Sequence, residues 1–220
     1  MIITLQNQKG GVGKTTLSLH LAHQLTLTGA RVLVVDADPQ GSARDWLQAR
    51  ETPAPFAVVG LDRPTIHRDI ATMLEDYDAV VIDSPPRVTD IARSAILAAD
   101  LVIIPVQPSP LDVWAAQHTV ALINDALIYK ETIKSVFAIN REIVNTAIGR
   151  DVSEALAESE TPALRSHVSQ RVSFAESIAQ GQTVFETKGD AKAIEEIKVL
   201  CAEIVEYVGS TPSEEVRRLA

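Results

Sequence analysis

The chain has little cysteine and no long hydrophobic run. Its single cysteine, Cys201, excludes a disulfide within the chain and points to a reducing compartment. No apolar run approaches the roughly 20 residues that a helix needs to cross a bilayer. The first residues form an apolar stretch without a basic leader, so no signal peptide is expected. These absences predict a soluble, cytoplasmic protein.

Positive charge is also scarce. The chain has 20 lysine and arginine residues against 29 aspartate and glutamate residues, which gives a net charge of −9. Any contact with nucleic acid must therefore come from a local basic patch rather than a uniformly basic surface. The histidines show no metal-ligand cluster. His20 and His23 lie close together on an expected helix, where we expect surface positions.

The chain does have enough apolar residues for a substantial core. It is 220 residues long and 46% hydrophobic, which suits one α/β domain over residues 1–209, followed by a short polar tail at 210–220. Apolar runs at 31–36, 79–83 and 101–106 are typical of parallel strands covered on both faces. The sequence therefore predicts a doubly wound, mostly parallel sheet flanked by helices. Weaker signals place a strand at 56–60, the last major parallel strand at 135–141, and helices at 42–50, 65–74, 113–127, 146–159 and 190–208.

The most informative stretch is residues 2–16, in which an apolar strand runs through a glycine-rich turn into a helix. A helix start leaves backbone N–H groups without partners and carries partial positive charge. Glycines in the turn let successive N–H groups point inward around an anion. Lys14 adds a full positive charge, and the Thr15 hydroxyl suits a magnesium ion bridging the phosphates. This is a P-loop in which Gln8 replaces the usual first glycine.

The segment from Lys9 to Thr15 resembles the deviant P-loop of the ParA/MinD family of ATPases, especially small, ParF-like partition proteins without an N-terminal helix-turn-helix. The resemblance implies that Lys9 reaches across an ATP-bridged homodimer to the partner's phosphates, as an arginine finger does. The alternative is a solvated Lys9 in an ordinary turn. One cysteine disfavours the related nitrogenase iron protein, which needs cysteine thiolates for its cluster. The implied nucleotide-binding residues are Gly10, Gly11, Val12, Gly13, Lys14, Thr15, Thr16 and, at the adenine, Asn140.

Carboxylates end two of the expected strands, where open α/β sheets bind ligands. The resemblance implies that Asp38 orients the attacking water and magnesium, and that Asp83 holds a magnesium-bound water. Asp36 is expected to be structural, and capping of the helix at 42–50 is an alternative role. Asp112 either caps the helix at 113–127 or lies near the nucleotide and the dimer interface. The implied catalytic residues are Lys9, Lys14 and Asp38, and the implied magnesium ligands are Thr15, Asp38 and Asp83.

Residues 162–200 resemble the part of ParA proteins that supplies basic residues to non-specific DNA. This segment contains five basic and five acidic residues, so it is neutral within an acidic chain. Non-specific DNA binding needs few direct contacts, because lysine and arginine raise the affinity by releasing counterions from the DNA phosphates. Solvated helix charges are the alternative interpretation. The candidate DNA-binding residues are Arg165, Arg171, Lys188 and Lys192.

The resemblance implies a partition ATPase that binds Mg²⁺ and ATP, dimerises, associates with the nucleoid and is stimulated by a ParB-like centromere-binding protein. A related possibility is an ATPase that positions a protein assembly on the nucleoid. A MinD-like, membrane-associated division regulator is a further alternative, but the polar tail is a poor amphipathic membrane helix, so no membrane partner is expected. A small-molecule kinase would need an acceptor site and a lid that the sequence does not indicate.

Overall fold

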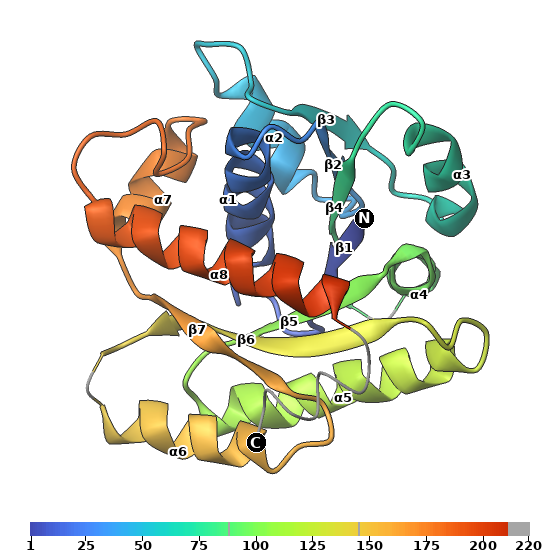
Figure 1. Ribbon diagram of the computed structural model, residues 1–220, viewed down its shortest axis with the longest axis vertical. Coiled ribbons are helices and arrows are strands. Elements are labelled where there is room, and N and C mark those ends of the chain that lie inside the picture. Colours follow the sequence, from blue (N-terminus) through green and yellow to red (C-terminus); the bar gives the residue numbers. More distant parts are fainter. Residues whose placement is uncertain (88, 145, 211–220) are drawn as a thin grey trace.

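The computed structural model describes residues 1–87, 89–144 and 146–210. Its centre is one sheet of seven strands, all paired in parallel (Figure 1). The strands are β1 (Ile2–Leu5), β2 (Val32–Asp36), β3 (Ala57–Gly60), β4 (Ala79–Asp83), β5 (Leu101–Val106), β6 (Lys134–Glu142) and β7 (Ala163–Ser169). Their order across the sheet is β3-β2-β4-β1-β5-β6-β7. The predicted doubly wound α/β fold is confirmed.

Helices cover both faces of the sheet, as continuously apolar parallel strands require. They are α1 (Lys14–Leu27), α2 (Ser42–Gln48), α3 (Ile66–Met73), α4 (Asp90–Ala98), α5 (Pro110–Leu127), α6 (Ala147–Ala157), α7 (Val172–Ala179) and α8 (Ala191–Gly209). Helices α1, α2, α7 and α8 bury apolar side chains on one face, and α3 to α6 do so on the other. The C-terminal ends of the strands therefore meet at one edge, between two helical layers.

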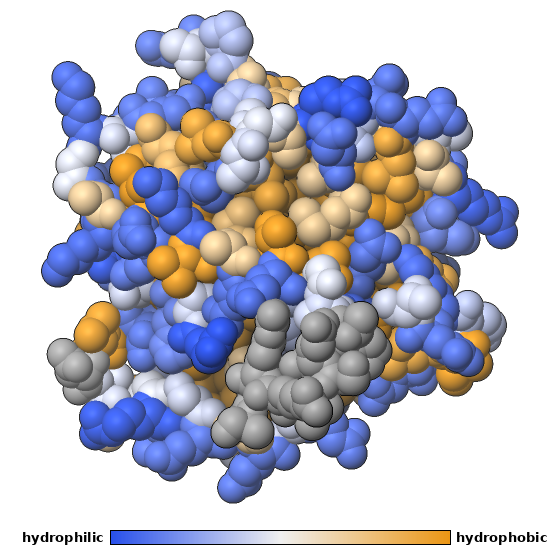
Figure 2. All heavy atoms as spheres, viewed as in Figure 1, coloured by the Kyte–Doolittle hydropathy of each residue, from blue (hydrophilic) through white to orange (hydrophobic). Residues whose placement is uncertain are grey.

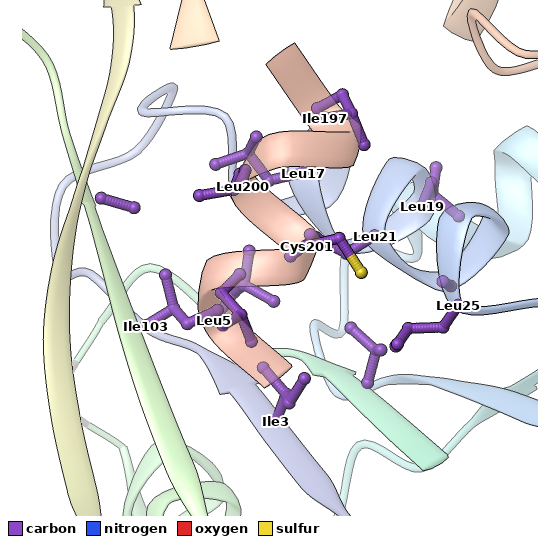
Figure 3. Packing of buried hydrophobic residues seen from close by; sticks show 14 of the residues in the cluster. Ile3, Leu5, Leu17, Leu19, Leu21, Leu25, Ile103, Ile197, Leu200 and Cys201 are labelled. Carbon is purple, nitrogen blue, oxygen red and sulfur yellow. The ribbon is translucent and has the colours of Figure 1, made fainter. Parts of the chain in front are cut away.

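The last helix completes the core around α1. Figure 3 shows Ile197, Leu200 and Cys201 of α8 close to Leu17 and Leu21 of α1, above the strands. Cys201 is buried, and burial raises the pKa of its thiol to about 11, as suits a small apolar core residue. On the face that α8 crosses, Figure 2 shows apolar side chains in the middle and hydrophilic ones around the rim.

Two expectations about the sheet and its helices are wrong. The strand at 135–141 is not the last, because β7 pairs with β6 at the edge of the sheet. Along most of β7, buried residues alternate with partly or fully exposed ones, which gives a weaker apolar signal than in the central strands. The helix expected at 113–127 begins at Pro110, and Ser109 occupies the N-cap position. Proline is favoured at a first helical position, so Asp112 lies inside the first turn and is not the cap.

The expectation that the histidines of α1 lie at the surface is also wrong. His20 is fully buried, and His23 is buried almost as completely. The His20 Nδ1 atom lies 2.7 Å from the Thr16 carbonyl oxygen, and its Nε2 atom accepts a hydrogen bond from the Val184 N–H at 3.1 Å. The reason is that the segment around Val184 covers the side of α1 that the sheet does not.

None of the helices in the described ranges is long and apolar enough to cross a membrane. The tail expected at 210–220 lies outside these ranges except for its first residue, Ser210. That residue follows α8, and its carbonyl oxygen accepts a hydrogen bond from Lys134 Nζ at 2.6 Å.

Candidate nucleotide and magnesium site

The glycine-rich turn joins β1 to α1 at the C-terminal edge of the sheet. Gly13 is the N-cap of α1 with φ of 95°, and Gly11 has φ of 78°, values that favour glycine. Gly10 and Gly11 are exposed to solvent. The turn therefore presents an accessible helix start, which is the geometry that binds phosphate.

Asn140 at the end of β6 supports this turn. Its side-chain amide donates a hydrogen bond to the Val12 carbonyl oxygen at 2.7 Å. A Cβ atom on Gly13 would lie 2.3 Å from the Asn140 amide nitrogen, so only glycine fits there. Asn140 also lines a cavity of about 330 Å³ together with Thr16 and Phe174. The predicted adenine contact of Asn140 is compatible with this cavity, because the amide oxygen remains as an acceptor.

Lys14 lies at the floor of the loop. Its Nζ atom donates to the Asn7 carbonyl oxygen at 3.0 Å and to the Lys9 carbonyl oxygen at 3.3 Å. Burial lowers the pKa of Lys14, and the charges of Asp83 and Asp38 partly oppose that shift. Two carbonyl oxygens of the loop thus hold the ammonium, and phosphate oxygens bound in the loop would replace them as its acceptors.

Lys9 points elsewhere. Its ammonium forms an ion pair with Asp112 in the first turn of α5, on a side chain that is 42% exposed. Asp112 itself is buried, and its second carboxylate oxygen has no hydrogen-bond partner within the described part of the chain. The two lysines of the loop therefore occupy different environments, one at the floor and one at the rim. Of the two roles left open for Asp112, the position beside the P-loop is the one that the structure supports.

Thr15 and Asp83, two of the predicted magnesium ligands, lie in contact with each other. The Thr15 hydroxyl donates to Asp83 Oδ2 at 2.6 Å, whereas the buried Oδ1 has no partner within the described part of the chain. Burial raises the Asp83 pKa to about 7, more than the Thr15 hydrogen bond lowers it. A buried carboxylate with a free oxygen beside a hydroxyl suits magnesium, which prefers oxygen ligands and uses substrate phosphates for the rest. In the described ranges, no group of three or more His, Cys, Asp or Glu residues could hold a metal.

Asp36 and Asp38 differ in their surroundings. Asp36 is fully buried and pairs in register with Asp83 on the neighbouring strand. It accepts hydrogen bonds from the Arg44 backbone N–H, in the first turn of α2, and from the Arg44 Nε–H. The expected structural role is confirmed, and it includes the alternative that Asp36 caps this helix. Burial raises its pKa, and the hydrogen bonds and charge of Arg44 oppose the rise. Asp38 is half-buried, and its carboxylate accepts from the Gln40 N–H at 3.0 Å.

The four candidate DNA-binding residues lie in β7, in α8 and in the segments before α7 and α8. One of them, Arg171, also lines the cavity that Thr16 and Asn140 border. Arg171 Nη2 binds Glu196 at 2.6 Å, and Arg165 Nε lies 3.5 Å from Glu203. Acidic residues of α8 therefore already accompany both arginines. Lys188 and Lys192 are exposed to solvent.

Sequence reasoning assigned no role to Asn7 and did not foresee the Lys9–Asp112 pair. Asn7 is buried, donates to the Pro105 carbonyl oxygen at 2.7 Å and accepts from the Lys9 N–H at 2.9 Å. A polar residue directly after an apolar strand is the signal that could have identified it. No local pattern could have shown that Asp112 contacts Lys9, because 103 residues separate the two.

A family model of the CobQ/CobB/MinD/ParA nucleotide binding domain matches residues 3–184. The chain belongs to this family. Its membership makes the chain an ATPase that uses ATP and magnesium.

Individual members of the family show how far the likeness extends. The chain is 30% identical over 207 residues to maintenance of carboxysome distribution protein A of Halothiobacillus neapolitanus, covering 92% of this chain and 95% of that protein. It is 37% identical over 135 residues to the chromosome-partitioning ATPase Soj of Thermus thermophilus, covering 48% of this chain and 54% of that protein. The solved septum site-determining protein MinD of Pyrococcus horikoshii, complexed with Mg-ADP, has a TM-score of 0.74 at 19% identity. That match covers 94% of this chain and 97% of that one, and it supports the fold alone.

Proposed function

We propose that the chain is a ParA-type positioning ATPase whose ATP-bound homodimer holds non-specific DNA and releases it after hydrolysis. The observation that carries this proposal is the separation of the two P-loop lysines. Lys14 lies at the floor of its own loop, while Lys9 lies at the rim with a partly exposed side chain. A cation at the rim is placed to serve a nucleotide that a second subunit brings to this face.

The residues around the P-loop divide the chemistry among them. Lys14 and the backbone N–H groups from Gly10 to Thr16 bind the phosphates. Thr15, Asp83 and Asp38 hold magnesium, which when bound offsets the negative charge of the phosphates. Asp38 orients the attacking water, and Lys9 of the second subunit stabilises the charge that develops in the transition state. Asn140 contacts the adenine.

DNA binding depends on Arg165, Arg171, Lys188 and Lys192. The two lysines are exposed and contribute counterion release directly, whereas each arginine must share its charge with a glutamate of α8. One such patch is weak in a chain with a net charge of −9. Two patches joined in a dimer bind far better, because the second contact becomes intramolecular. Hydrolysis then separates the patches and releases the protein from the nucleoid.

The cargo that we propose first is a plasmid or chromosome, attached through a ParB-like centromere-binding protein that stimulates hydrolysis. A protein assembly is the second candidate. It is favoured by the match to a carboxysome distribution protein over nearly the whole of both chains, whereas the match to the chromosome-partitioning ATPase covers about half of each. Co-purification on centromere DNA with a ParB-like protein supports the first candidate, and co-purification with a protein assembly in the absence of that DNA supports the second.

The dimer is tested by sedimentation of the Asp38→Ala variant in saturating Mg-ATP, because blocked turnover traps the ATP state. We expect a dimer, and a monomer when Lys9→Ala is added. Lys198→Ala, which removes an exposed lysine of α8, is the matched control and leaves the dimer intact. A monomeric Asp38→Ala protein that still binds ATP would refute the proposal.

DNA retention is measured with ATP, with ADP and without nucleotide. We expect retention only with ATP, and no ATP-dependent binding to anionic lipid vesicles. ATP-dependent vesicle binding without DNA retention would instead support a MinD-like, membrane-associated regulator.

A further inference from the structure

The main chain of Asp38 is held on both sides by one ion pair. Asp36 Oδ1 accepts a hydrogen bond from the Asp38 N–H at 3.2 Å, and Arg44 Nη2 donates to the Asp38 carbonyl oxygen at 3.0 Å. The two holding residues are themselves joined, because Arg44 Nε lies 3.3 Å from Asp36 Oδ2. The Arg44 backbone N–H also donates to that oxygen at 3.0 Å. Both peptide groups of Asp38 thus bond to this ion pair, and the Gly41 N–H also donates to the Asp38 carbonyl oxygen at 2.9 Å.

The surrounding backbone leaves room for this guanidinium. A Cβ atom on Gly60 would lie 2.9 Å from Arg44 Cδ, and one on Gly41 would lie 3.2 Å from Arg44 Nε. The Leu61 N–H donates to the Asp36 carbonyl oxygen at 2.9 Å, which fixes the end of β3 beside the same group. A larger side chain at either glycine would crowd Arg44, so the end of β3 and the N-cap of α2 both leave room for the arginine.

We propose that Arg44, acting with Asp36, is a positioning residue for ATP hydrolysis. It holds the Asp38 peptide so that the carboxylate lies where it orients the attacking water, and this inference rests on the role proposed above for Asp38. Phosphoryl transfer depends on positioning, and a displacement of about 1 Å costs on the order of 100-fold in rate. Arg44 bonds to the loop at 36–38 and lies 3.6 Å from Asp62, and the described residues show no bond from it to the P-loop. It therefore acts on the rate of hydrolysis rather than on nucleotide affinity.

The side chain must be arginine to fill this role. Its planar guanidinium directs Nε to Asp36 and Nη2 to the Asp38 carbonyl oxygen at the same time. A lysine ammonium keeps the charge beside the buried carboxylate but has no rigid fork for two acceptors. Lysine at this position should therefore preserve folding and recover only part of the activity.

The test compares Arg44→Gln and Arg44→Lys with the wild type. We expect kcat to fall about 100-fold in Arg44→Gln and about 10-fold in Arg44→Lys, with KM for Mg-ATP within about 3-fold of the wild type. Arg93→Gln is the matched control, since Arg93 pairs with Asp90 on the exposed side of α4 and should not affect turnover. Melting temperatures of the nucleotide-free proteins show which variants fold. If Arg44→Gln does not fold, the fall in kcat of Arg44→Lys still tests the proposal.

A second readout requires no turnover. Hydrogen exchange at the Asp38 amide in the nucleotide-free protein should become at least about 10-fold faster in Arg44→Gln, because the acceptor of that N–H is no longer fixed. Wild-type kcat together with unchanged exchange in a folded Arg44→Gln protein would overturn the inference. Asp38→Asn, assayed in parallel, distinguishes a failure of the role proposed for Asp38 from a failure of the role proposed for Arg44. If Asp38→Asn hydrolyses ATP normally, the proposed role of Asp38 fails; if it is inactive while Arg44→Gln is normal, only the role of Arg44 fails.

Discussion

Protonation of His20 should destabilise the nucleotide-free protein, and the size of the effect follows from its burial. Both ring nitrogens are engaged inside the fold, with the Thr16 carbonyl on one side and the Val184 N–H on the other. The Val184 N–H needs an acceptor, so Nε2 carries no proton and the imidazole is neutral. Burial lowers the His20 pKa from 6.5 to about 4. The folded protein therefore binds fewer protons than the unfolded chain between these values.

The sign and size of the pH effect follow from linkage. The His20 contribution is complete above pH 6.5 and is lost as pH falls towards 4, because the unfolded chain takes up the proton first. A shift of this size corresponds to roughly 3 kcal/mol of unfolding free energy in full, of which about 2 kcal/mol is lost by pH 5. Asp83 acts in the opposite direction, because its folded pKa of about 7 lies above its ordinary value. Burial also lowers the pKa of His23 and raises the pKa of Asp36, so the wild-type pH profile alone mixes several effects.

The assay that isolates His20 is urea unfolding of the wild type and of His20→Gln at pH 8 and pH 5, in EDTA without nucleotide. Glutamine stays neutral at both values and keeps one donor and one acceptor. Between pH 8 and pH 5 we expect the wild type to lose about 2 kcal/mol more unfolding free energy than the variant. Equal losses in the two proteins, within about 0.5 kcal/mol, would refute the reasoning.

Four further predictions concern the nucleotide site, the candidate DNA-binding residues and the buried cysteine. Lys14→Ala should abolish ATP binding measured by calorimetry, because the phosphates lose the cation at the floor of the loop; unchanged affinity would contradict the site. Replacing both Lys188 and Lys192 with alanine should reduce the slope of log K for DNA against log salt by about 2 per subunit, and an unchanged slope would remove both residues from the interface. Arg171→Ala should weaken DNA retention and leave ATP binding intact, as a filter assay at several salt concentrations would show. Cys201 should resist thiol reagents at pH 8 in the native protein and react on unfolding, since burial raises its pKa to about 11.

Much of the fold could be predicted because its signals are local. A run such as 79–83 is apolar until the aspartate that ends it, so its length, burial and position at the ligand edge all follow from a few neighbouring residues. The P-loop is similarly contained within one strand, one turn and one helix start. In each case a single stretch of sequence carries both the structure and the chemistry.

The errors arise where distant segments decide the environment. His20 is buried because the segment around Val184 packs on α1, and 164 residues separate the two. Asp112 looks like a helix cap in its own sequence, yet its partner is a lysine in the first loop. The sequence does not predict β7, because an edge strand with alternating exposure has fewer apolar residues than a central strand.

The match to the family ends at residue 184, but the hydrophobic core continues beyond it. Ile197, Leu200, Cys201 and Ile204 of α8 complete the cluster around α1, the helix that begins at the phosphate-binding turn. Truncation of the protein to the matched segment would remove α8 and expose the leucine side chains of α1 that α8 covers. An exposed apolar surface of this kind favours aggregation. The unit that can be transplanted is set by packing, and it includes the last helix.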